Sequence, residues 1–173
     1  MLDRASAILV VIDLQEAFRR AIPQFDMLVT NANRLLAGAR RLGVPLVVTE
    51  QYPAGLGSTV PELDTGGVQV VAKRQFSAVG VEGFDLGSRE HAIVCGVEAH
   101  VCVYQTVIDL LGKGVGVDVC FDAVGSRHET DMQVAVKRMA TCGAAVTTAE
   151  TVLFELCRTS ADPEFKALHR LII

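Results

Sequence analysis

The clearest indication of the fold is the run Ala7-Ile8-Leu9-Val10-Val11-Ile12. Its residues are all apolar and mostly β-branched, with no polar residue alternating between them. A continuous apolar run of this length is typical of a parallel strand that is covered on both faces. Five further stretches share this character, the last of them more weakly: residues 44–49, 68–72, 91–97, 115–121 and 146–148.

Helical patterns separate these predicted strands. The clearest covers residues 27–42, where leucine and alanine recur at spacings of three and four and Gly43 follows as a stop signal. Four similar patterns predict helices from His100 to about 112, and over 129–142, 150–157 and 163–171. Strands that alternate with helices imply right-handed crossovers. We therefore expect an α/β fold: a three-layer α/β/α sandwich around a mostly parallel, doubly wound sheet of five to six strands.

The chain length and one irregular segment bear on domain organisation. A chain of 173 residues suits one core, so residues 1–173 are expected to form a single domain. Residues 51–67 contain four glycines and two prolines and predict a long irregular loop. Loops of this length are more often functional than idle, and we interpret this one as a lid or an oligomer contact.

Charge, hydropathy and cysteine usage exclude several classes of function. The formal net charge is −4 and no basic stretch is present, which argues against nucleic acid as a partner. The longest apolar run is far shorter than the ~20 residues of a membrane span, and the first residues lack the layout of a signal peptide. We therefore expect a cytoplasmic protein with no membrane partner. Five cysteines without a Cys-x-x-Cys pair argue against a disulfide framework and a zinc site.

Polar residues follow the predicted strands, at the edge where open parallel sheets bind ligands. Cys102 falls in the first helical turn after a strand, where unpaired N–H groups and the cation of Lys73 favour a thiolate. Asp13 is placed to accept or return a proton, which completes the set of groups needed for acyl transfer. Each residue also has a structural interpretation: a buried cysteine, a helix-capping aspartate and a solvated lysine. Glu50 and Asp122 follow strands as well, and we expect them to cap or pair.

Three separated motifs resemble one family of enzymes. They are Asp13-Leu14-Gln15 followed by Phe18, Lys73 followed by Phe76-Ser77-Ala78, and Gly96-Val97-Glu98-Ala99-His100-Val101-Cys102-Val103. In this order they resemble the isochorismatase-like cysteine hydrolases, over essentially the whole chain. The version around Cys102 is most similar to the isochorismatase-domain-containing subgroup.

The resemblance implies a catalytic triad of Asp13, Lys73 and Cys102. It also implies a cis peptide bond between Val97 and Glu98, and an oxyanion hole formed by the N–H groups of Glu98 and Cys102. The implied reaction is hydrolysis of the C–N bond of a small amide through a thioester on Cys102, with Asp13 as general acid and base and Lys73 as charge stabiliser. Two further functions stay open: hydrolysis of another small electrophile such as an ester or vinyl ether, and a catalytically idle binding or scaffold role.

The resemblance also guides the predictions on ligands and assembly. Nicotinamidases of this family bind a metal through an aspartate and histidines after the second strand, whereas the first histidine here is His91. We therefore expect neither metal nor cofactor. A small-molecule substrate is expected, and relatives that assemble predict a homo-oligomer, a dimer or larger. Four residues are candidates for the substrate pocket: Phe18, Tyr52, Phe76 and His100.

Overall fold

A computed structural model describes residues 1–68 and 70–173. Within these residues, six strands form one sheet in the order β3-β2-β1-β4-β5-β6, and every pair of neighbours is parallel. This confirms the predicted doubly wound sheet. The strands are β1 (Ala7–Ile12), β2 (Leu46–Gln51), β3 (Val70–Lys73), β4 (His91–Val97), β5 (Gly116–Gly125) and β6 (Ala145–Thr147).

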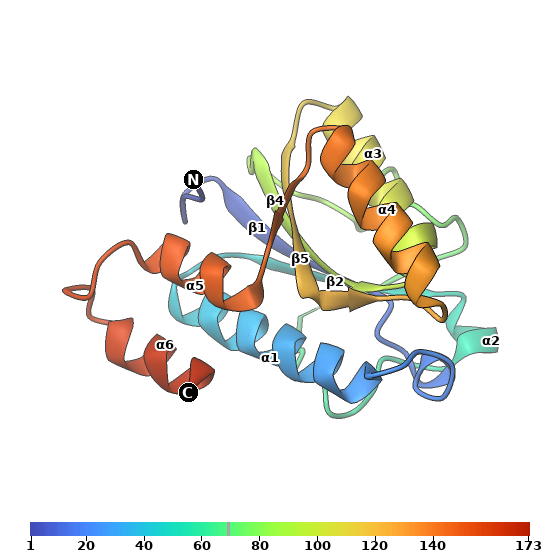
Figure 1. Ribbon diagram of the computed structural model, residues 1–173, viewed down its shortest axis with the longest axis horizontal. Coiled ribbons are helices and arrows are strands. Elements are labelled where there is room, and N and C mark those ends of the chain that lie inside the picture. The colour runs from blue at the N-terminus through green and yellow to red at the C-terminus, as the bar shows by residue number, and fades with distance from the viewer. Residues whose placement is uncertain (69) are drawn as a thin grey trace.

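Helices cover both faces of the sheet and complete the three layers (Figure 1). One face carries α1 (Phe25–Arg41), α5 (Ala149–Cys157) and α6 (Phe165–Ile172), and the other carries α3 (Tyr104–Gly112) and α4 (Glu129–Thr141). The central strand β1 shows why its sequence does not alternate. Its odd-numbered residues pack into the core under α1 and its even-numbered residues pack into the core under α3. The three-layer prediction is confirmed.

Several element boundaries differ from the sequence-based expectations. Strand β5 continues to Gly125, because Ala123 and Val124 return to the core after the partly exposed pair at 121 and 122. Asp122 therefore lies inside a strand, and Glu50 lies inside β2 rather than after it. Strand β3 begins at Val70, and residue 69 of the predicted strand 68–72 lies outside the described residues.

The segment 51–67 is more ordered than its glycines and prolines predict. It contains the short helix α2 (Pro53–Leu56), and Thr59 forms an isolated bridge with Gln15. The carboxylate of Glu50 accepts hydrogen bonds from the main-chain N–H and the hydroxyl of Thr59, at 2.6 and 2.7 Å. Val60 is buried, which further anchors the segment. Most of residues 51–67 is irregular, as predicted, apart from Gln51 in β2, helix α2 and the bridge at Thr59. The use of this segment as a lid or contact stays a prediction.

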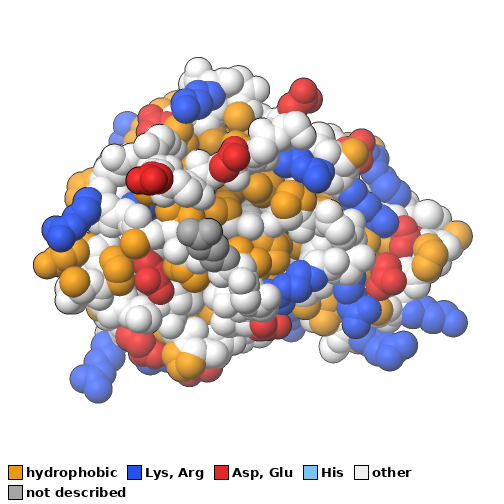
Figure 2. Space-filling view, turned by 180° about the vertical axis from the view of Figure 1, so that it is seen from behind, with side chains coloured by type: hydrophobic (Ala, Val, Ile, Leu, Met, Phe, Trp, Pro, Cys, Tyr) orange, Lys and Arg blue, Asp and Glu red, His pale blue; other side chains and the backbone are white. Residues whose placement is uncertain are grey.

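The surface carries both apolar and charged groups. On the face opposite to that of Figure 1, apolar side chains reach the surface across the middle, with charged side chains of both signs around them (Figure 2). Across residues 1–68 and 70–173, no helix is both long and apolar enough to cross a membrane.

Candidate active site

Three chain-distant residues meet at the carboxyl edge of the sheet. Asp13 directly follows β1, Lys73 is the last residue of β3, and Cys102 lies in a π-helical turn, Ala99–Val103, between β4 and α3. Asp13 adopts a left-handed backbone conformation with φ of 53°, which aspartate tolerates better than most residues. The parallel sheet brings these strand ends to one edge, so the predicted convergence of the three residues has a simple topological cause.

Asp13 and Lys73 form a fully buried ion pair. The ammonium Nζ of Lys73 donates to Oδ2 of Asp13 at 2.7 Å, and neither side chain is exposed to solvent. Nζ also donates to Oε1 of Gln51 at 2.8 Å and to the main-chain oxygen of Phe76 at 3.0 Å. The hydroxyl of Thr49 donates to the other aspartate oxygen, Oδ1, at 2.7 Å. A buried ion pair is tolerated only when its polar atoms are satisfied in this way.

Cys102 lies beside this ion pair with a protonated thiol. Burial raises the pKa of the Cys102 thiol from 9.0 to about 12, and the carboxylate of Asp13 adds to the increase while the ammonium of Lys73 opposes it. The expectation of a resting thiolate is therefore wrong. That expectation took account of the helix terminus and Lys73, but not of the burial of the thiol or of the carboxylate of Asp13, which both raise its pKa. A thiol in this state becomes nucleophilic only when a neighbouring base takes its proton.

Two residues of β2 belong to the site and were missed from the sequence. Gln51 places Oε1 between the ammonium of Lys73, at 2.8 Å, and the sulfur of Cys102, at 3.9 Å. Thr49 holds Asp13. Side chains of a strand alternate between its two faces, so Thr49 and Gln51 share a face that Glu50 does not. Sequence reasoning selected Glu50 because it is charged, whereas the period-two pattern pointed to its neighbours.

Gln15, from the first motif, anchors the strand end that carries Gln51. Its amide nitrogen donates to the main-chain oxygens of Gln51 at 3.1 Å and Gly57 at 2.6 Å, and its Oε1 accepts from the main-chain N–H of Gln51 at 2.8 Å. Gln15 is completely buried. This side chain fixes the position of β2 against the segment that contains α2.

A pocket of about 310 Å³ opens above Cys102. Phe18 and Phe76 line it, as predicted, and Gln51, Glu98 and Arg127 contribute its polar groups. Arg127 was missed because it lies after β5, with no motif to mark it. The residues that line the pocket do not include the other two predicted substrate residues, Tyr52 and His100.

Tyr52 and His100 contact other groups near the pocket. The guanidinium of Arg74 lies 4.2 Å from the centre of the Tyr52 ring, and this ring is 40% exposed. Nδ1 of His100 lies 2.9 Å from the hydroxyl of Ser126. Both side chains therefore have structural partners that the sequence did not reveal.

Glu98 follows the cis peptide bond that joins it to Val97. Its carboxylate oxygen Oε1 accepts hydrogen bonds from the main-chain N–H of Arg127 at 3.2 Å and from Nε of Arg127 at 2.9 Å. The cis bond agrees with the expectation from the sequence. The oxyanion hole expected from the N–H groups of Glu98 and Cys102 stays a prediction.

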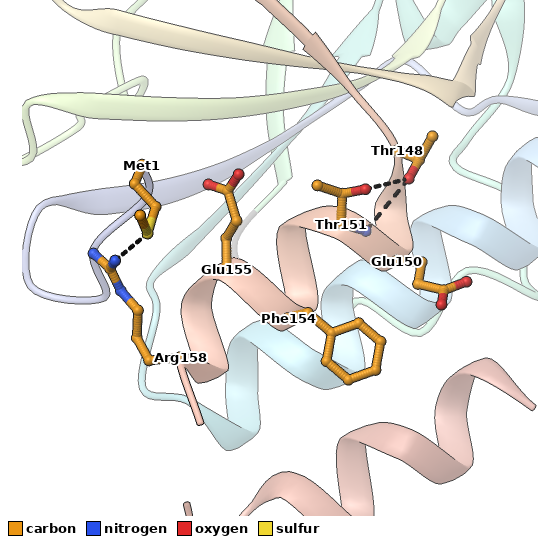
Figure 3. A pocket seen from close by; sticks show the side chains of 7 residues that line it. All are labelled: Met1, Thr148, Glu150, Thr151, Phe154, Glu155 and Arg158. Atoms are coloured by element: carbon orange, nitrogen blue, oxygen red, sulfur yellow. Dashed lines mark hydrogen bonds between the residues drawn. The ribbon is translucent and has the colours of Figure 1, made fainter. Parts of the chain in front are cut away.

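A larger pocket lies elsewhere and lacks this chemistry. It measures about 620 Å³ and lies between the N-terminus and α5 (Figure 3). The side chains that line it include Met1, Phe154, Glu155 and Arg158, and none of the predicted site residues. Volume therefore does not single out the pocket at Cys102, which is distinguished instead by the buried polar network around it.

The remaining cysteines and acidic residues have structural surroundings. Cys95, Cys120 and Cys157 are buried, whereas Cys142 is exposed. Cys142 caps the end of α4. Asp122 accepts a hydrogen bond from the first N–H of α5 at 2.9 Å, so its predicted capping role is confirmed. No group of three metal-ligating side chains was found in the described part of the chain.

Comparison with known proteins identifies the class to which this fold and site belong. The family model for the isochorismatase domain matches residues 7–151, a span that includes Asp13, Lys73 and Cys102. The chain belongs to the isochorismatase family and has its hydrolase fold.

Two vertebrate relatives are similar over nearly the whole chain. Isochorismatase domain-containing protein 2 of Homo sapiens is 42% identical over 170 residues, which cover 96% of this chain and 83% of the relative. Isochorismatase domain-containing protein 2A of Mus musculus is also 42% identical, over 96% of this chain and 82% of the relative.

Two solved structures show the same fold. The MAR1 ribonuclease from Caenorhabditis elegans superposes with a TM-score of 0.94 at 42% identity, over 99% of this chain and 91% of that one. The YcaC gene product of Escherichia coli, described as an octameric hydrolase of unknown specificity, has a TM-score of 0.83 at 23% identity, over 98% and 88% of the two chains.

Proposed function

We propose that this protein is a cysteine hydrolase that cleaves the C–N bond of a small amide or related compound. The observation that carries the proposal is the placement of the Cys102 thiol beside the buried ion pair of Asp13 and Lys73, at the base of a pocket of about 310 Å³. A nucleophile, a proton acceptor and a fixed positive charge are the groups that acyl transfer requires. The triad of Asp13, Lys73 and Cys102 is therefore our assignment of the catalytic residues.

The proposed reaction has two halves. Asp13 takes the proton of the Cys102 thiol as Sγ attacks the carbonyl carbon, and the resulting oxyanion is bound by the N–H groups of Glu98 and Cys102. Asp13 then returns the proton to the departing amine, which leaves a thioester. Water attacks the thioester, Asp13 accepts the water proton, and the proton passes to the sulfur as the carboxylic acid leaves. Lys73 stabilises the negative charge that moves between Asp13 and Cys102.

The high pKa of Cys102 supports this order of events. Because the thiol is protonated at rest, transfer of its proton to a base is coupled to the attack of Sγ on carbon. The base must therefore lie beside the sulfur. Gln51 accepts from Lys73 and faces Sγ, so it positions the ammonium for that coupling.

Ribonuclease activity is a second candidate because of the similar structure of that name. A small pocket with apolar walls and the carboxylate of Glu98 favours a small molecule over a polyanion. The net charge of −4 argues in the same direction. Hydrolysis of a small ester or vinyl ether is a third candidate, and a catalytically idle binding role is a fourth.

The test is a hydrolysis screen with matched variants. Small amides, ureides, esters, vinyl ethers and single-stranded RNA are incubated with the wild type, Cys102→Ala and Cys142→Ala. We expect amide or ureide turnover and a mass increase on Cys102 in the wild type and in Cys142→Ala, and neither in Cys102→Ala. Turnover retained in Cys102→Ala, or RNA cleavage as the sole activity, contradicts the proposal. Binding without turnover favours the idle role.

We also propose that the protein is a cytoplasmic homo-oligomer. All five cysteines are free, which suits a reducing compartment. Exposed apolar side chains on the face shown in Figure 2, and an octameric structure with the same fold, support assembly. Sedimentation velocity should give a dimer or larger species, and a single species of 18.5 kDa would contradict this.

A further inference from the structure

The side chain of Glu98 has no part in the proposed reaction, which uses only its main-chain N–H. Glu98 lines the pocket above Cys102, and its side chain is only 9% exposed. Both hydrogen bonds from Arg127 go to one carboxylate oxygen, Oε1. One oxygen of Glu98 is thereby held in place, and the orientation of the carboxylate is fixed.

The second oxygen, Oε2, differs from Oε1 in its partners. It accepts no hydrogen bond from any of the residues that the structure describes, 1–68 and 70–173. Within the same residues, no side-chain oxygen sealed from solvent lacks a partner. Oε2 is therefore accessible to solvent-sized molecules, and Glu98 is one of the residues that line the pocket.

A carboxylate oxygen without a protein partner in such a wall selects for hydrogen-bond donors. It accepts hydrogen bonds and cannot donate them. The surrounding walls from Phe18, Phe76 and Val101 are apolar, so a bound ligand that presents a lone pair to Oε2 loses solvation without gaining a partner. A ligand that presents an N–H group makes a charge-assisted hydrogen bond there.

We propose that Glu98 is the specificity residue of this site and that it binds the N–H group next to the scissile carbonyl. The substrates that it selects are primary amides and ureides, and it disfavours esters and tertiary amides of the same shape. This inference rests on the proposed hydrolase function, because it needs Cys102 to be the residue that attacks the substrate.

Two small electrophiles test the inference without knowledge of the natural substrate. Acrylamide and methyl acrylate carry the same reactive alkene, and only acrylamide has N–H groups. In each case Sγ bonds to the terminal carbon and the thiol proton ends on the neighbouring carbon, so nothing else is consumed. The rates of alkylation at Cys102 and at the exposed Cys142 are followed in the same sample by peptide mass spectrometry.

The expected result is a preference at Cys102 that Cys142 lacks. The ratio of the acrylamide rate to the methyl acrylate rate should be about tenfold or more higher at Cys102 than at Cys142. In Glu98→Gln, the acceptor for Arg127 is retained while an NH₂ group replaces Oε2, and the ratio at Cys102 should fall towards that at Cys142. Glu62→Gln changes an exposed carboxylate that is also bonded to an arginine, Arg19, and should keep the wild-type ratio.

The failures of the two proposals are distinguishable. Equal ratios at Cys102 and Cys142 in the wild type overturn the role of Glu98, and this measurement decides the matter even if Glu98→Gln does not fold. A loss of both rates in equal proportion in Glu98→Gln also overturns it, because the side chain then only positions the backbone. If Cys102 is alkylated by neither compound, the proposed function itself fails.

Discussion

Oδ2 of Asp13 and Nζ of Lys73 lie 2.7 Å apart, sixty residues apart in the chain, with neither side chain exposed to solvent. They meet because β1 and β3 flank β2 in the sheet. Transfer of two charges from water to the interior is unfavourable, and their attraction and hydrogen bonds offset that loss only while both are present. The same ion pair therefore affects both the free energy of unfolding and the reactivity of Cys102.

Removal of one partner from this ion pair should destabilise the fold strongly. Lys73→Met leaves Asp13 buried without its cation, and we expect a loss of about 3–5 kcal/mol in the free energy of unfolding. In the double variant Asp13→Asn/Lys73→Met the charges are both gone, and the loss should be well below the sum of the single losses. Urea unfolding of the wild type, Lys73→Met, Asp13→Asn and the double variant measures this difference. Additive losses would show that the two charges do not interact.

The hydroxyl of Thr49 should be needed for turnover. Thr49→Val conserves shape but removes the hydrogen bond to Oδ1 of Asp13, which leaves a buried carboxylate oxygen without its donor. We expect a loss of about 1–3 kcal/mol in stability and a fall in kcat, because Asp13 is no longer held beside the sulfur. Thr49→Ser keeps the hydroxyl and should recover most of kcat. Equal kcat in the valine and serine variants would contradict this role.

Buried thiols should make the fold less stable at high pH. Burial raises the pKa of Cys95 and of Cys102 from 9.0 to about 12 in the folded protein, while the unfolded chain titrates near the ordinary value. Below pH 9 the thiols are protonated in both the folded and the unfolded protein, so their burial takes nothing from the free energy of unfolding there. From pH 9 towards pH 12 the unfolded thiols ionise first, so each cysteine lowers stability by about 1.4 kcal/mol per pH unit.

Urea unfolding between pH 8 and pH 11 measures this slope. Cys95→Ala should have a shallower slope than the wild type, whatever stability it loses to the cavity at pH 8. Identical slopes in the two proteins would show that Cys95 does not titrate on unfolding.

Gly96 should tolerate no side chain. Its φ is 117°, and a Cβ placed there would collide with the main chain of Ile12 in the neighbouring strand. Gly96→Ala should therefore destabilise the protein by several kcal/mol, because neither backbone can move without breaking the β1–β4 ladder. Gly112→Ala, at the end of α3 with nothing within 4 Å, should change stability by about 1 kcal/mol or less. Thermal unfolding of both variants gives the comparison.

The sequence predicts most of the fold because its strands are buried on both faces. The apolar runs predict both ends of β1 and both ends of β4 correctly, because polar residues flank each run. Strand β5 is predicted too short because Phe121 and Asp122 interrupt its apolar run, and only the packing of the next two residues shows that it continues. The order around residues 51–67 depends on long-range bonds such as Glu50 to Thr59, which local composition does not encode.

The candidate site is predicted in part. Topology requires Asp13, Lys73 and Cys102 to share one edge, so their motifs are enough to place them together. The protonation state of Cys102 is predicted wrongly, because burial and the pairing of Lys73 with Asp13 are properties of the assembled site. Gln51 is missed because only the alternation of side chains along β2 distinguishes it from the charged Glu50, and Arg127 is missed because an arginine after a strand carries no local signal of function.

Lys73 ends the four-residue strand β3, which within the described sheet borders only β2. Strands at the rim open at a lower free energy than strands at the centre. Such fraying would withdraw the ammonium from the carboxylate while the other strands stay paired. On warming, activity is therefore expected to be lost before the protein unfolds, so the edge strand sets the upper temperature at which the site works.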